Sequence, residues 1–133
     1  MGIKRAKILM EAGDVDGARQ ELLELVDIDP SSEGAWLLLV GIGYGTNDAT
    51  LSLRAFRELK KTRSRDAYVA SGLVDCLIQL ERYEEAKQEI QRFSEVAEPG
   101  LPFHDTVLEE HRRALEFIRG RLSESDQGDA SAP

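Results

Sequence analysis

With 133 residues, of which 41% are hydrophobic, the chain is large enough to form one packed domain. Its formal net charge of −8 argues against general binding to nucleic acids or anionic membranes, since both need concentrated Lys and Arg. A single cysteine, Cys76, excludes an internal disulfide and a multi-cysteine metal site. Aromatic residues make up 6% and charged residues 32%, which is typical of helices with one solvated face, so we expect an all-α protein.

The first part of the chain is predicted to form pairs of helices. The first members of these pairs cover about residues 3–12, 32–44 and 66–80. In the second members, apolar residues such as Leu22 and Val26 are spaced by three or four, which places them on one helix face. Each pair therefore has an apolar side that has to be covered.

The pattern returns every 34 residues, which indicates an internal repeat with copies at about 1–32, 33–66 and 67–98. A helix pair cannot bury its apolar face alone, so the copies are expected to stack on one another. The recurring positions are Gly13, Asp14, Ala18, Leu22, Leu25 and Pro30, then Asn47, Asp48, Ser52, Phe56, Leu59 and Ser64, and finally Glu81, Arg82, Ala86, Ile90, Phe93 and Glu98.

The repeat is interrupted after Glu98 by the segment 99–102, which contains two prolines and a glycine. A further amphipathic helix is predicted over about 105–122, where it would cover the last copy as a capping helix. Residues 123–133 are rich in Ser, Asp, Gly and Ala, so we expect them to be disordered.

The recurring residues resemble the tetratricopeptide repeat (TPR) family, whose unit has the same length and an aromatic, Leu, Ala and Pro pattern. The resemblance implies about three degenerate repeats and a capping helix, arranged as a right-handed superhelical stack of antiparallel helix pairs, a TPR-like α-solenoid. The residues that carry it are Ala18 and Pro30 in the first copy, Trp36, Leu39 and Phe56 in the second, and Leu73, Tyr83 and Ala86 in the third.

In this family the first helix of each pair lines a concave groove that holds extended peptides or helices. At the positions of the family's carboxylate clamp only Lys7 is basic here, so recognition of chaperone tails is disfavoured and an apolar partner segment is favoured. The resemblance thus implies a cytoplasmic protein–protein interaction scaffold, adaptor or chaperone-like, that binds a peptide or amphipathic helix. The implied groove residues are Lys7, Met10, Leu37, Gly41, Tyr44, Tyr68, Ser71, Asp75, Ile78 and Gln79.

A basic segment at 54–65 has two interpretations. Cations near the C-terminal end of a helix oppose its macrodipole, which is a purely structural role. Alternatively, Arg54, Arg57 and Lys61 dock an acidic partner, including a second copy of this chain. In that case the protein is a self-associating structural or assembly module that uses its repeat ends and this segment.

The glycines at 41, 43 and 45 also have two interpretations, because each Gly inside a helix costs about 1 kcal/mol relative to Ala. They either allow close helix packing and early fraying, or they widen the groove beside Tyr44. Both are kept open.

Catalytic chemistry is not predicted, since two histidines and one cysteine provide no nucleophile with a convergent base. Glu110 and His111 are adjacent and diverge on a helix, which disfavours a metal site. We expect a buried, inert thiol at Cys76, no cofactor, no enzymatic activity and no membrane or nucleic-acid partner. With no apolar leader segment at the N-terminus, a cytoplasmic location is expected.

Overall fold

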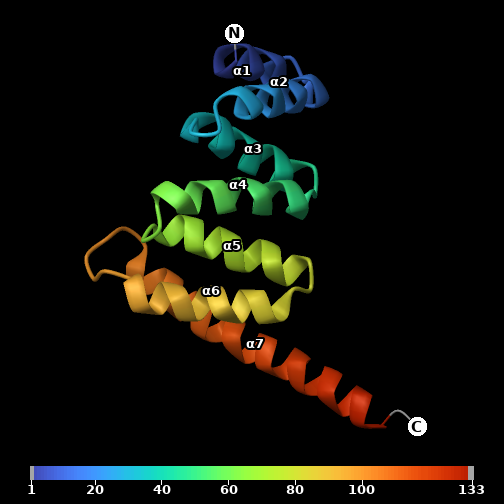
Figure 1. Cartoon of the computed structure of the whole chain (residues 1–133), viewed down its shortest axis with the longest axis vertical. Coiled ribbons are helices and arrows are strands. Elements are labelled where there is room, and N and C mark those ends of the chain that lie inside the picture. Colours follow the sequence, from blue (N-terminus) through green and yellow to red (C-terminus); the bar gives the residue numbers. More distant parts are fainter. Residues whose placement is uncertain (1, 132–133) are drawn as a thin grey trace. The chain divides into compact units, whose positions relative to one another are not determined.

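The computed structural model describes the backbone of residues 2–131 and the side chains of residues 2–124 (Figure 1). Over that range the chain forms seven α-helices and no strand, which confirms the all-α prediction. The chain divides into two compact units, Met1–Thr62 and Arg63–Pro133. The helices are α1 (Ile3–Glu11), α2 (Val15–Ile28), α3 (Glu33–Gly45), α4 (Ala49–Thr62), α5 (Ala67–Gln79), α6 (Tyr83–Val96) and α7 (His104–Ser131).

The three turns inside the helix pairs have the same backbone geometry, 34 residues apart. Gly13, Asn47 and Glu81 have φ values of 84°, 55° and 58°. In each turn the next residue donates its backbone N–H to a carbonyl five residues earlier, at 2.8, 2.7 and 2.8 Å. The turn period predicted from the sequence is therefore confirmed, even at Glu81, where the residue type is unfavourable for a positive φ.

Side-chain caps begin several helices where the sequence places Asp or Ser. The Asp14 carboxylate accepts the backbone N–H of Gly17 at 2.9 Å, and the Asp66 carboxylate accepts those of Tyr68 and Val69 at 2.8 and 3.2 Å. These bonds satisfy donors that the first turn of a helix leaves unpaired. The helix starts are thus determined locally.

In the first unit, α2 packs against α1 and α3, and α3 packs against α4. Small residues allow the close approach of α3 and α4: Ser52 is 1% exposed, and its Oγ donates to the carbonyl of Val40 at 3.1 Å. A Cβ on Gly43 would collide with this hydroxyl and with the backbone of α4. The glycine at position 43 therefore serves close packing, whereas a Cβ at Gly41 or Gly45 would meet nothing within 4 Å.

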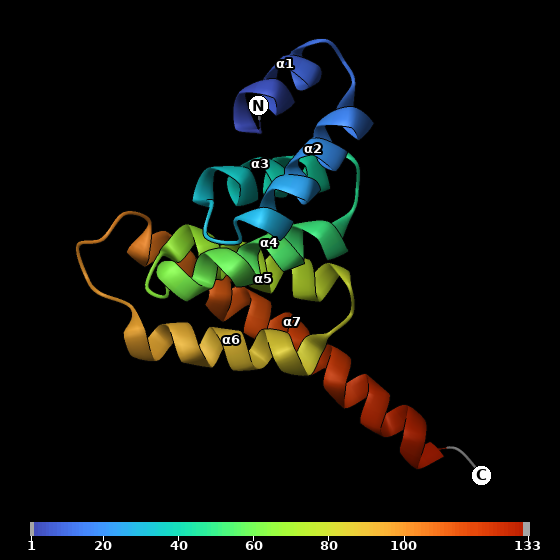
Figure 2. The same cartoon turned by 45° about the horizontal axis from the view of Figure 1, so that its top comes forward.

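In the second unit, α5 and α6 form an antiparallel pair, and α7 packs against both (Figures 1 and 2). Phe93 of α6, Val107 of α7 and two alanines of α5 form one buried cluster. Ile118 lies eleven residues after Val107 on α7, about three helical turns further along, and it is fully buried as well. A helix that covers the last pair, as predicted, is therefore present.

The bounds of α7 differ from the prediction of a helix over about 105–122 and a disordered segment over 123–133. The helix begins at His104 and continues to Ser131, and the remaining two positions of the predicted tail lie outside the described residues. Composition suggested disorder, but no proline interrupts this stretch, and extending an existing helix avoids the cost of a new nucleus. The right-handed superhelical course of the pairs and the TPR resemblance stay predictions.

Candidate functional site

The predicted groove residues of the first unit lie on α1 and α3. Lys7 and Gly41 are exposed, Met10 and Leu37 are half-buried, and the Tyr44 side chain is 43% exposed. Their spacing of three or four residues puts those of each helix on one face. The Tyr44 ring also contacts Phe56 of α4 edge-on, with 6.1 Å between ring centroids. The exposed Tyr44 ring is thus supported by the buried Phe56 ring of α4.

The remaining candidates lie on α5 in the second unit. Tyr68 is 47% exposed, Ser71 and Ile78 are half-buried, and Asp75 and Gln79 are exposed. Gln79 donates to the Asp75 carboxylate at 3.0 Å, and the Ser71 hydroxyl donates to Glu110 of α7 at 3.4 Å. The ten candidates divide between the two units, so one continuous groove through all of them stays a prediction.

The basic segment has partners within its own chain. Arg54 lies 4.0 Å from the Asp27 carboxylate and stacks over the Trp36 ring, with 5.3 Å between its guanidinium carbon and the ring centroid. Lys61 contacts Glu58 at 2.9 Å, and Arg65 pairs with Glu98. These contacts are mostly exposed, where an ion pair contributes at most about 1 kcal/mol. Arg54 and Lys61, which we also considered for docking an acidic partner, therefore have a structural role within the chain.

A groove between α6 and α7 was not predicted from the sequence. It encloses about 480 Å³ and is lined on its apolar side by Ile90, Leu108 and Leu115. The sequence signal for it was weak: the apolar stripe of the predicted capping helix includes Leu108 and Leu115, which stay half-buried after α7 has packed against α5 and α6. The other lining residues are Lys87, Gln91, Ser94, His111, Arg112 and Arg119.

His111 lies at this groove and is 4% exposed, and neither of its ring nitrogens has a hydrogen-bond partner among the described residues. The ring contacts Phe93 edge-on, with centroids 5.7 Å apart. Burial lowers the pKa of His111 below its ordinary value of 6.5, since desolvation disfavours the imidazolium, and the negative charges of Glu110 and Glu89 oppose this only in part. The side chain is therefore held as neutral imidazole in an apolar setting.

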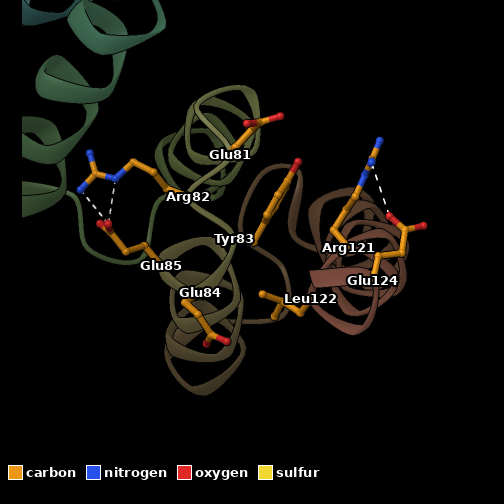
Figure 3. A pocket seen from close by; sticks show the side chains of 8 residues that line it. All are labelled: Glu81, Arg82, Tyr83, Glu84, Glu85, Arg121, Leu122 and Glu124. Atoms are coloured by element: carbon orange, nitrogen blue, oxygen red, sulfur yellow. Dashed lines mark hydrogen bonds and ion pairs between the residues drawn. The ribbon is translucent and has the colours of Figure 1, made fainter. Parts of the chain in front are cut away.

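A second hollow of about 640 Å³ lies at the turn between α5 and α6 and the adjoining part of α7 (Figure 3). Four of its six charged side chains form two pairs: Arg82 contacts Glu85 at 2.7 Å, and Arg121 contacts Glu124 at 3.6 Å. The remaining two, Glu81 and Glu84, are exposed carboxylates, which by themselves do not define a binding site. We assign no site here.

The described part of the chain contains neither a cluster of metal-ligating side chains nor an exposed thiol. Side chains of residues 2–124 include no group of three or more His, Cys, Asp or Glu arranged to hold a metal ion. The Cys76 thiol is fully buried, which confirms the prediction of a buried thiol. Among residues 2–131, no helix is both long and apolar enough to cross a membrane.

In comparisons with known proteins, no family model matches this chain and no curated protein matches it.

Proposed function

We propose that this protein is a scaffold that binds a segment of a partner polypeptide on the exposed faces of α1, α3 and α5. The observation that carries the proposal is that these three helices, the first members of the three pairs, each present an exposed or half-buried row of candidate residues. Tyr44 and Tyr68 are more than two-fifths exposed, and Leu37 and Ile78 on the same two helices are half-buried. Aromatic and apolar groups of this kind supply most of the affinity in protein interfaces.

The turns support a preformed surface on each helix pair. Because the backbone of each pair is fixed by an equivalent turn and by buried side chains, each pair loses little conformational entropy on binding. Most of the ordering cost then falls on the partner segment, as expected for a peptide or amphipathic helix that orders when it binds. The proposal includes an adaptor or chaperone-like role in the cytoplasm.

The test is selection of binding peptides from a displayed random library by the immobilised full chain, followed by fluorescence anisotropy of the selected peptides. The variant Leu37→Lys with Tyr68→Glu adds charge to α3 and α5. The control variant Gln20→Lys with Gln88→Glu makes the same charge changes at exposed positions of α2 and α6. Loss of binding only in the first variant supports the proposal. Equal binding by both variants, at unchanged helicity, refutes it.

Self-association is the second candidate, and one observation favours it. Ile8 of α1 is 57% exposed and Ile28 of α2 is 85% exposed, so the first unit carries large apolar side chains in contact with solvent. Ile8→Glu is expected to lower the mass measured by light scattering if α1 forms a contact between copies. A chain that is monomeric at every concentration excludes this alternative.

A further inference from the structure

The groove between α6 and α7 is bordered by two helices along several turns. On α6 its lining runs from Lys87 to Ser94, and on α7 from Leu108 to Arg119. At a rise of about 1.5 Å per residue these stretches are about 10 and about 16 Å long. A volume of about 480 Å³ spread over such a length suits a row of side chains from an elongated segment.

In the second unit α7 packs against both α6 and α5. The half-buried Leu108 and Leu115 are the apolar positions left on this side of α7. A single further helix would bury them.

Charge identifies the chemistry of that helix. The whole chain has a formal net charge of −8, yet the groove is lined by three cations and by no Asp or Glu. Arg112 is already bound by Glu109 and Glu116, at 2.7 and 3.0 Å. Neither Lys87 nor Arg119 has an ion pair with any described side chain. Two unneutralised cations beside an apolar floor match a helix with Leu-like residues on one face and carboxylates at its edges.

We propose that the α6–α7 groove binds an acidic amphipathic helix of a partner polypeptide, with the apolar face on Ile90, Leu108 and Leu115 and carboxylates paired to Lys87 and Arg119. This binding mode uses none of the residues proposed above for α1, α3 and α5. It can therefore hold or fail independently of the proposed function.

The experiment measures binding of the purified full chain to displayed peptides of about four helical turns. Their apolar face is constant, with Leu spaced by three and four, and their flanking positions are randomised among Glu, Lys and Gln. Glu is expected to be enriched at the flanks. Fluorescence anisotropy of a selected peptide is then compared between wild type, Lys87→Glu with Arg119→Glu, and the charge-matched control Lys4→Glu with Arg5→Glu on α1.

The groove variant is expected to lose about tenfold in affinity, the effect of two exposed ion pairs, whereas the control changes by less than about twofold. Leu115→Ser, a milder change at a half-buried site, is expected to weaken binding as well, and circular dichroism checks that each variant is folded. Enrichment of Lys or Gln, or equal binding by groove and control variants, overturns the proposal. Peptide binding that is lost in Leu37→Lys with Tyr68→Glu instead assigns the peptide to the other surface. Dimerisation abolished only by the groove variant makes a second copy the occupant, and this also overturns the proposal.

Discussion

Replacing Gly43 with alanine is expected to destabilise the first unit, although alanine is the better helix former. A Cβ at this position would stand 2.9 Å from the carbonyl oxygen of Asp48 and 2.9 Å from the backbone nitrogen of Ser52, and closer still to the Ser52 hydroxyl. Two of these three atoms belong to the backbone and cannot rotate away. The α3–α4 pair must therefore separate, or the helices must shift along each other.

The magnitude follows from three contributions. Alanine in place of glycine in a helix gains about 1 kcal/mol. Overpacking of a close helix contact costs about 1–3 kcal/mol. Displacing the buried Ser52 hydroxyl from the Val40 carbonyl, now 3.1 Å away, costs about 1–1.5 kcal/mol. The net expectation is a loss of about 2 kcal/mol in the free energy of unfolding.

Gly41→Ala is the matched control, because it lies in the same helix and its Cβ would meet nothing within 4 Å. This variant is expected to gain about 1 kcal/mol, so the two alanine variants should differ by about 3 kcal/mol, or about 10 °C in Tm. Urea denaturation followed by circular dichroism measures both. Adding Ser52→Ala to Gly43→Ala should restore part of the lost free energy of unfolding, because it removes the hydroxyl that the Cβ would meet. The recovery should be incomplete, because the two backbone contacts remain. A Gly43→Ala protein as stable as Gly41→Ala would refute the packing argument.

Three further changes test other parts of the structure by the same denaturation assay. Glu81→Gly is expected to raise the free energy of unfolding by about 0.5–1 kcal/mol, because φ is 58° at this residue. Gly13→Ala, at a φ of 84°, is expected to lower it by about 1 kcal/mol, and changes of the opposite sign would contradict the shared turn geometry. Asp66→Ala should cost about 1 kcal/mol through the loss of its two cap bonds, and Asp66→Asn should recover most of it, so an unchanged Asp66→Ala would exclude the cap. Because the pKa of His111 is lowered in the folded chain, the unfolded chain takes up a proton near pH 6.5 that the folded chain does not. The free energy of unfolding should therefore fall as the pH drops below that value, by at most about 1.4 kcal/mol per pH unit. His111→Leu should show a shallower fall between pH 7 and 5, and equal slopes for the two proteins would show that the ring titrates equally in both states.

The helix pairs and their turns could be predicted because their causes are local. A cap bond or a turn bond joins residues at most five apart, as in Asp14 with Gly17, and a helix face is set by a spacing of three or four. Tyr44 and Tyr68 were suggested instead by the family resemblance, as groove residues, and the structure leaves both side chains more than two-fifths exposed. Prediction and structure differ at residues 123–131, where composition suggested disorder and α7 continues, because a helix that has already formed can extend through such residues.

The sequence patterns could not predict which residues far apart in the chain contact each other. The partners of the basic segment are far apart in the chain, as in Arg54 with Asp27 and Arg65 with Glu98. The purpose of the glycines at 41, 43 and 45 differs from one to the next, and only the position of α4 separates them. No periodicity distinguishes a glycine that faces a neighbouring helix from one that faces solvent.

The sequence by itself determined the helical class, the repeat length, the turns and most of the faces that are buried, because each follows from spacing and from bonds between near neighbours. Only the tertiary structure decided which glycine lies against a neighbouring helix, which cations are paired, and that α6 and α7 leave a groove lined by cations and apolar side chains. Those properties depend on the distance between helices, which is set by the side chains of both partners packing together.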